Sequence, residues 1–383
     1  MTKKIIVAFD TFKGCMSATE ACDAAAEGIH SALPDTKVIK LPLSDGGEGL
    51  VECVKRLLPT AEITLSVYGP LMEKVVCEYA MSHDGKTAYM EMAAASGLTL
   101  VPQDKRNPMN TTTYGVGEMI ADAIGRGCET IVMGIGGSAT CDAGEGMLRA
   151  LKDKGLLHTK CNYIVACDVT NPLYGEQGAA YVFAPQKGAT PEQVRLLDQR
   201  LRAFANKTVK DGIATAHMAD FPGAGAAGGL GYAFLAYLNA KLQSGIDTVL
   251  DIAGFDEIIK DADIVITGEG KSDVQTLMGK APYGVQKRCI SAGVVTWLLS
   301  GAIDDPECVL SRHFANVRSI NENDTRPLAQ LLLPEVAKYN LKQTVKKIIS
   351  GREQKYSQTL LSSYNSQTPY LTPVNTSDDP KKH

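Results

Sequence analysis

The sequence contains no long apolar run and no cysteine or histidine pattern typical of a metal site. No stretch of about 18 apolar residues occurs, so no transmembrane helix is predicted. The 10 cysteines form no C-x-x-C pair and the 6 histidines form no H-E-x-x-H motif, which argues against zinc and dithiol sites. The first apolar run ends at Asp10, too early for the core of a signal peptide. We therefore expect a cytoplasmic protein that does not bind a membrane.

Basic clusters and aromatic residues are also scarce. The net charge is −4, and only 6% of the residues are aromatic. Because no basic patch stands out, nucleic acid is not an expected partner. The 383 residues, 44% of them hydrophobic, can form two or three domains with cores of their own. Small molecules are therefore the expected partners, and the sequence leaves a homo-oligomer open.

The order of strand and helix signals predicts an α/β fold. A strand at 4–9 is followed by a helix that begins at Ser17, where Ser17 and Glu20 form a capping box. A second strand at 36–43 completes the β-α-β unit of a parallel sheet. Three β-rich segments without a helix between them then fall within 61–93, and the β-α rhythm resumes near residue 115. This change of pattern predicts that a second domain is inserted into the first.

Acidic residues and glycine turns follow most of the predicted strands. Ligands of open α/β sheets bind at the carboxyl ends of the strands, so these residues are candidates for one shared site. A single Asp after a strand is more often a helix cap or a turn former. Five such positions in one chain favour a shared polar site instead. These positions are Asp10 with Lys13, Asp45 with Glu48, the turn "GIGGSAT" at 134–140, Asp168, and Glu269 with Asp273.

Two glycine motifs imitate dinucleotide-binding fingerprints, which keeps a nicotinamide-dependent oxidoreductase as an alternative. "GIGGSA" at 134–139 follows a predicted strand, whereas "GAGAAG" at 223–228 does not, and neither has a clearly placed acid beyond it. In the first motif, Gly136, Gly137 and Ser138 either offer N–H groups to an anion at a helix start or pack tightly against a strand. For the second motif, close backbone packing is the favoured interpretation.

A third stretch, "VITGEGKSD" at 265–273, ends like a phosphate-binding P-loop. Val265 stands where that loop needs its first glycine, so we interpret Gly270-Lys271-Ser272 as a coincidence. The acids Glu269 and Asp273 are then the more informative residues of this stretch.

Four basic residues lie beside Gly, Pro or Asn in turn-like settings. A lysine in a loop is by default a solvated charge. The alternative is contact with an anionic ligand, because the predicted site also contains glycine turns and acids. These residues are Lys13, Arg106, Lys187 and Lys280.

Taken together, these stretches resemble the bacterial type-1 glycerate kinases from about residue 3 to about residue 320. The resemblance rests on "DTFKG", "SDGGEG", "EMAAASGL", "RNPMNTTTYGVGE", "GIGGSATCDAGEGML", "ACDVTNPLYGEQGAAYVFAPQKGAT", "PGAGAAGGLG" and "GEGKSDVQTLMGKAP". The family implies ATP- and Mg²⁺-dependent phosphorylation of D-glycerate, with 2-phospho-D-glycerate as the expected product. A glycerate 3-kinase and a kinase of another small hydroxy acid are alternatives, as is a binding protein that does not catalyse.

The resemblance also implies the domain arrangement. We expect a Rossmann-like, three-layer parallel-sheet domain that is interrupted by a second α/β domain, with the active site in the cleft between them. The expected Rossmann-like domain comprises 1–60, 105–155 and 256–350. The inserted domain comprises 61–104 and 156–255, and a polar tail follows at 351–383.

Within this expected site we assign roles by chemistry. A kinase orients the attacking hydroxyl with an acceptor, for which Asp45 is the first choice and Asp273 the second. Mg²⁺ binds one or two carboxylates together with phosphate oxygens, which suggests Asp168 and Glu269. Arg106 and Lys13 suit the glycerate carboxylate, and Lys13 is also counted as catalytic. The remaining assignments are Asp10, Glu48 and Lys187 for the substrate, and Gly136, Gly137, Ser138 and Lys280 for ATP phosphates.

Overall fold

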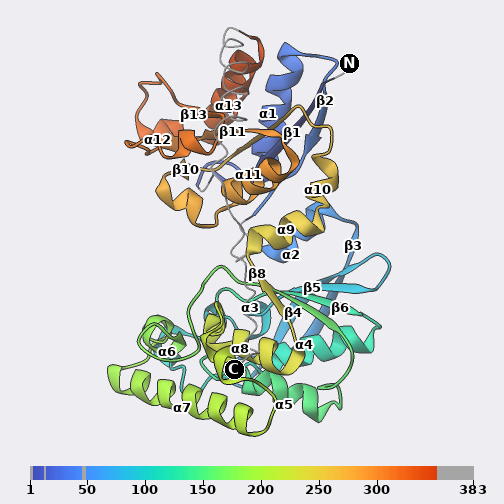
Figure 1. Ribbon diagram of the computed structural model, residues 1–383, viewed down its shortest axis with the longest axis vertical. Helices are drawn as coiled ribbons and strands as arrows, with labels where there is room; N and C mark the ends of the chain where they lie inside the picture. The colour runs from blue at the N-terminus through green and yellow to red at the C-terminus, as the bar shows by residue number, and fades with distance from the viewer. Residues whose placement is uncertain (1–2, 13, 45–48, 352–383) are drawn as a thin grey trace, which may run out of the picture.

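The structure is a computed structural model that describes residues 3–12, 14–44 and 49–351. Lys13, Asp45 and Glu48 of the predicted site lie outside the described residues. Figure 1 shows an elongated molecule with two lobes, each built on a sheet of its own. The chain is therefore of the mixed α/β class, as predicted.

The first sheet has five parallel strands in the order β13-β11-β9-β1-β2. Side chains alternate between its two faces along each strand. In β1, Ile5 and Val7 pack with helices α1 and α13, whereas Ile6 and Ala8 pack with α9 and α11. The result is the expected three-layer arrangement. The elements are β1 (Lys4–Phe9), β2 (Lys37–Lys40), β9 (Ile264–Gly268), β11 (Val295–Ser300), β13 (Asn316–Ser319), α1 (Ala18–Ala32), α9 (Gly245–Ile252), α11 (Ala281–Ala292) and α13 (Pro334–Ile349).

The strand order of this sheet reverses between β1 and β9. The chain moves outward from β1 to β2, leaves the sheet, and later returns on the other side of β1 as β9, β11 and β13. In doubly wound sheets, ligands bind outside the carboxyl ends of the strands at such a reversal. The topology therefore directs attention to the residues that follow Phe9 and Gly268.

The second sheet has six strands in sequence order. Its first three strands are antiparallel, and β5 to β8 are parallel. Helices α4, α5 and α8 cover one face, while α2 and α9 pack on the other face. The elements are β3 (Thr60–Tyr68), β4 (Lys74–Ser82), β5 (Thr87–Glu91), β6 (Thr130–Gly134), β7 (Asn162–Ala166), β8 (Lys241–Gln243), α2 (Leu50–Leu57), α4 (Tyr114–Gly125), α5 (Glu145–Asp153) and α8 (Ala226–Leu238).

The expected position of segment 105–155 in the Rossmann-like domain was wrong. Its strand β6 pairs with β5 and β7 in the six-stranded sheet. A β-α-β rhythm occurs in both sheets, so the rhythm alone could not assign this segment to one of them. The five-stranded sheet takes its strands from 4–40 and 264–319, and the six-stranded sheet takes its strands from 60–243.

Helices α2 and α9 lie where the two lobes meet (Figure 1). One apolar cluster contains Leu50 and Val54 of α2, Val249 of α9, Ala8 of β1 and Tyr89 of β5. Because this cluster contains residues of both sheets, burial of apolar surface holds the lobes together.

Local sequence signals explain where three of the helices begin. The capping box of Ser17 and Glu20 begins α1, and Thr190 caps α7 (Pro191–Lys210) with Pro191 at the first helical position. Residues 328–349 form two helices, α12 (Leu328–Leu331) and α13, because Pro334 starts a new helix. Among the described residues, no helix has the length and apolar character needed to span a bilayer.

Candidate functional site

Asp10 and Glu269 lie next to each other at the reversal point of the five-stranded sheet. Asp10 follows β1, and its backbone N–H donates to the carbonyl of Gly268 at 3.0 Å. Glu269 follows Gly268 at the end of the neighbouring strand. Both side chains are buried. Two of the predicted acids are thus brought together by strand pairing alone.

The Glu269 carboxylate has a complete set of donors. Its Oε1 accepts from the hydroxyls of Ser272 at 3.0 Å and Thr276 at 2.7 Å. Its Oε2 lies 3.2 Å from Nζ of Lys280, which is the N-cap residue of α11. A buried carboxylate is stable when it is paired and hydrogen-bonded in this way. Lys280 was predicted to bind phosphate, and here it neutralises Glu269.

The other charged residues of this loop serve its backbone or its surface. Asp273 caps the 3₁₀ helix η5 (Val274–Met278), where it accepts from the N–H of Gln275 at 2.9 Å. Lys271 is exposed and pairs with Asp304 at 2.9 Å. Val265 lies inside β9, so the near-match to a P-loop is a strand followed by a different turn.

The turn at 134–140 lies at the carboxyl end of β6, in the six-stranded sheet. Gly137 has φ +70°, and its carbonyl accepts from the N–H of Leu98 at 2.8 Å. Among the described residues, the N–H groups of Gly136, Gly137 and Ser138 donate no hydrogen bond. Adjacent free N–H groups around a left-handed residue form an anion-binding concavity. The expected helix start was wrong, because α5 begins only at Glu145.

Lys187 is buried beneath this turn, with only 3% of its surface exposed. Its Nζ donates to Oγ of Ser138 at 2.6 Å and to the carbonyl of Thr140 at 2.7 Å. Burial lowers the pKa of Lys187 to about 8, partly offset by Cys141 and Asp142. Lys187 and Ser138, which were assigned to the substrate and to the ATP phosphates, are therefore in direct contact with each other. The expected direct contact of Lys187 with a substrate is opposed by this burial.

The backbone of Arg106 packs against Gly188, the residue that follows Lys187. A Cβ on Gly188 would lie 2.2 Å from the carbonyl oxygen of Arg106, and Gly188 has φ +94°. Only glycine tolerates both conditions, so Gly188 holds the Arg106 loop against Lys187. The Nε of Arg106 donates to the carbonyl of Val101 at 3.5 Å.

Asp168 follows β7 at the same edge of the six-stranded sheet. Its carboxylate accepts from the N–H of Gly245 at 2.8 Å, near the start of α9. Asp168 is exposed, unlike Glu269. Within the described part of the chain, no three His, Cys, Asp or Glu residues form a ready metal cluster. The assignment of Asp168 and Glu269 to Mg²⁺ stays a prediction.

The motif at 223–231 packs as expected for a close backbone approach. A Cβ on Gly225 would lie 2.1 Å from the carbonyl oxygen of Pro172, and one on Gly228 would lie 2.1 Å from that of Thr140. Gly228 therefore supports the 134–140 turn from behind, and a side chain there would displace it.

Chain connectivity brings the two carboxyl edges, the edges at which the parallel strands of the two sheets end, near each other. The N–H of Leu43 donates to the carbonyl of Phe9, so the chain still runs beside β1 at that point. The N–H of Gly49 donates to Oε1 of Glu91, the last residue of β5, at 2.6 Å. Five peptide steps span at most about 18 Å, which limits the separation of Ser44 from Gly49. Asp45 and Glu48 belong to this connection and lie outside the described residues.

Sequence reasoning missed two acids that organise these loops. Glu91 receives the N–H of Gly49, as described above. Asp142 accepts from both the N–H and the hydroxyl of Thr113 at 2.8 Å, and from the N–H groups of Gly144 and Gly146. Both lie within motifs that were recognised as a whole. Neither acid directly follows a predicted strand, which is the pattern that identified the other candidate acids.

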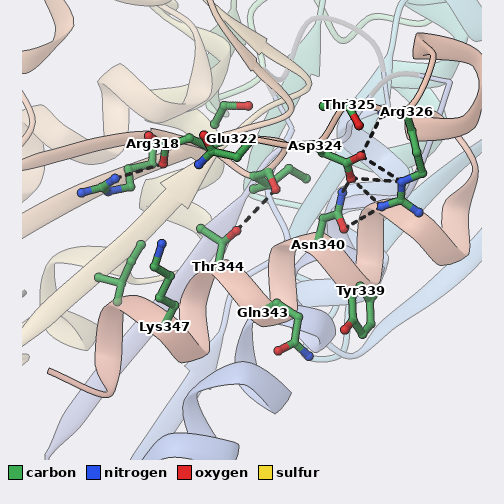
Figure 2. Close-up of a pocket in the computed structure, with 14 residues that line it drawn as sticks. Arg318, Glu322, Asp324, Thr325, Arg326, Tyr339, Asn340, Gln343, Thr344 and Lys347 are labelled. Carbon is green, nitrogen blue, oxygen red and sulfur yellow. Dashed lines mark hydrogen bonds and ion pairs between the residues drawn. The ribbon is translucent and has the colours of Figure 1, made fainter. Parts of the chain in front are cut away.

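A cavity of about 420 Å³ lies elsewhere, between the loop after β13 and helix α13. Figure 2 shows Asp324 paired with Arg326 and hydrogen-bonded to Asn340 at this cavity. None of the predicted site residues lines it. The cavity therefore does not contribute to the candidate site.

Comparison with known proteins decides the family. The sequence profile of the "Glycerate kinase family" matches residues 5–157 and 154–352. The chain belongs to the glycerate kinase family.

The family relatives cover most of the chain. It is 44% identical to the glycerate kinase of Bacillus subtilis strain 168, over 81% of this chain and 88% of the relative. It is 41% identical to the glycerate 2-kinase of Escherichia coli K12, again over 81% and 88%. A crystal structure of a Salmonella typhimurium LT2 protein, assigned as glycerate kinase 2, superposes with a TM-score of 0.78 at 37% identity. That match covers 94% of this chain and 100% of the other.

Proposed function

We propose that this chain transfers the γ-phosphoryl group of ATP to a hydroxyl of D-glycerate. Family membership supports the reaction, and one structural observation supports the location. The turn that carries free N–H groups at Gly136, Gly137 and Ser138 is also contacted by the buried cation Lys187, through Ser138 and Thr140. Phosphoryl transfer depends mainly on positioning and on neutralisation of charge, and this turn offers both.

The reacting groups are proposed to meet between the two carboxyl edges. Asp45 is the proposed acceptor for the proton of the attacking hydroxyl, and the turn at 134–140 holds phosphate or carboxylate oxygens. Arg106 is the proposed partner of the glycerate carboxylate. The support for this arrangement is the short connection from Ser44 to Gly49, which begins at one edge and ends at the other.

Mg²⁺ is the proposed metal, held by one protein carboxylate and by phosphate oxygens. Asp168 fits this role, because it is exposed at the edge that also carries the turn at 134–140. Glu269 fits less well, since its carboxylate oxygens already accept from two hydroxyls and an ammonium group. Mg²⁺ would neutralise charge that develops on the transferred phosphoryl group.

The proposed product is 2-phospho-D-glycerate, in line with the name of the Escherichia coli relative. The position of phosphorylation depends on how glycerate is oriented between the base and the γ-phosphate. The ³¹P NMR spectrum of the product separates the 2-phosphate from the 3-phosphate.

A coupled assay of ADP release with D-glycerate and ATP–Mg²⁺ tests the reaction directly. We expect saturable turnover with D-glycerate. Turnover with another small hydroxy acid but not with glycerate would overturn the substrate while keeping the kinase. Binding of both ligands without turnover would favour a binding protein, and fluorescence of bound NADH would favour the oxidoreductase alternative.

A further inference from the structure

We propose that Lys187 is a buried counter-charge for the oxyanion bound at the 134–140 turn, and that it acts through the hydroxyl of Ser138. This inference rests on the proposed function and makes Lys187 a positioning residue, because its Nζ is shielded from any ligand. The bound group is an oxyanion, which belongs either to a phosphate of ATP or to the carboxylate of glycerate.

Lys187 has no counter-charge in direct contact with its ammonium group. Its two partners, Oγ of Ser138 and the carbonyl of Thr140, are neutral oxygens. Among the described residues, no carboxylate forms an ion pair with Lys187. A buried charge without a partner is costly, so a protein that retains one gains something else from it.

The groups around Lys187 do not remove this charge. Asp142 is the nearest acid, and its carboxylate is occupied by Thr113, Gly144 and Gly146. Burial raises the pKa of Cys141 to about 11, so its thiol is neutral at pH 7. Arg106 packs against Gly188 through its backbone carbonyl and brings no carboxylate to Lys187. The surroundings therefore favour an added anion.

Lys187 fixes the direction in which the hydroxyl of Ser138 can donate. An ammonium group has donors only, so the Ser138 oxygen must accept from Lys187. The hydroxyl proton of Ser138 then points elsewhere, and no acceptor for it exists among the described residues. Together with the free N–H groups of Gly136 and Gly137, it forms a set of donors without acceptors. The fully buried hydroxyl of Thr140 also lacks a partner, which shows that the turn is not satisfied by the protein alone.

Binding of an anion should therefore change the protonation of Lys187. Burial holds its pKa near 8, and a nearby negative charge would raise it. At pH 8, Lys187 is neutral in about half of the protein molecules before the ligand binds. Binding therefore takes up about half a proton per ligand at pH 8, and close to none at pH 6. Isothermal titration in buffers of different ionisation enthalpy measures this uptake.

The experiment uses the full-length protein titrated with ATP–Mg²⁺, D-glycerate and inorganic phosphate in separate arms. The arm that shows proton uptake identifies the ligand held at the turn. Inorganic phosphate separates this inference from the kinase proposal, because the proton uptake that accompanies phosphate binding does not depend on glycerate being the substrate. No proton uptake at pH 8 in any arm that shows binding would overturn the inference, and failed glycerate turnover alone would overturn only the kinase proposal.

Matched variants sharpen the result. Lys187→Met should abolish the proton uptake and weaken binding of the ligand by about 10- to 100-fold. It removes the positive charge that is connected to the anion by two hydrogen bonds, through the hydroxyl of Ser138. Lys210→Met, at the exposed end of α7, is the control and should change neither. Ser138→Ala should weaken binding while proton uptake persists. If Lys187→Met binds all three ligands as the wild type does, Lys187 is merely structural.

Discussion

The two carboxyl edges of this molecule differ in whether a buried charge has a partner of opposite charge. At the five-stranded sheet, Glu269 is buried together with Lys280 and two donating hydroxyls. At the six-stranded sheet, Lys187 is buried with neutral oxygens only. The first edge is electrostatically complete, whereas the second has a positive charge and free N–H donors in excess.

This difference indicates where a ligand contributes most. A complete network such as that of Glu269 stabilises its own loop and gains little from an added ion. An incomplete one gains a partner when an anion arrives. We therefore expect substitutions at the first edge to affect folding and loop position, and those at the second to affect binding and its pH dependence.

The largest expected effect belongs to Asp45, in the segment that connects the two edges. Asp45→Asn keeps the size of the side chain but removes its ability to accept a proton. We expect kcat to fall by about 100- to 10,000-fold, because general base catalysis typically contributes that much. The melting temperature should stay close to that of the wild type. A near-normal kcat would mean that Asp45 is not the base, and Asp273→Asn would then be the next variant to measure.

The pH dependence of stability gives the next largest effect. The folded protein binds the Lys187 proton less tightly than the unfolded chain does, because burial lowers the pKa to about 8. Below pH 8 the protonated lysine therefore destabilises the fold, and this cost disappears as the pH rises from about 8 to 10.5. Lys187→Met avoids the cost at every pH.

Denaturant unfolding of the wild type and Lys187→Met across pH 6 to 10.5 tests this. The variant should be the more stable protein near pH 7, and its advantage should shrink by about 3 kcal/mol toward pH 10.5. Using the difference between the two proteins cancels the other groups that titrate in this range. An advantage that stays constant with pH would show that Lys187 is charged with equal ease in both states.

Strand pairing explains which parts of the site could be predicted. Asp10 and Glu269 were expected together because each directly follows a strand, and parallel strands end at one edge. Lys187 was recognised from the turn around it, but its burial depends on Gly188 meeting Arg106 across the fold. No local pattern encodes such a contact. Segment 105–155 was misplaced for a similar reason, since strand β6 suits either sheet by its own sequence.

At the first edge, Glu269→Ala should destabilise the fold more than it changes ligand affinity. It leaves Ser272, Thr276 and Lys280 without their acceptor, and we expect a loss of about 2–3 kcal/mol in unfolding free energy. Because Lys280 is partly exposed, this loss is smaller than that of a fully buried ion pair. Glu269→Gln, which still accepts hydrogen bonds, should lose less. If Glu269→Ala unfolds like the wild type but no longer responds to Mg²⁺, Glu269 is a metal ligand after all.

The smallest effect is expected at Lys271, the residue that imitates a P-loop lysine. Its ion pair with Asp304 joins two exposed side chains, and such pairs contribute about 0.2–1 kcal/mol. Lys271→Ala should therefore change kcat and KM by no more than about twofold, since a surface pair of this strength does not hold the site. Lys280→Ala leaves the buried Glu269 without its counter-charge, so we expect it to destabilise this loop and to lower kcat/KM more than Lys271→Ala does, through displacement of the loop. Steady-state kinetics of both variants compare a surface lysine with a paired one at the same loop. The reverse ranking would mean that phosphate binds at Gly270-Lys271-Ser272, and that the five-stranded edge rather than the 134–140 turn is the incomplete one.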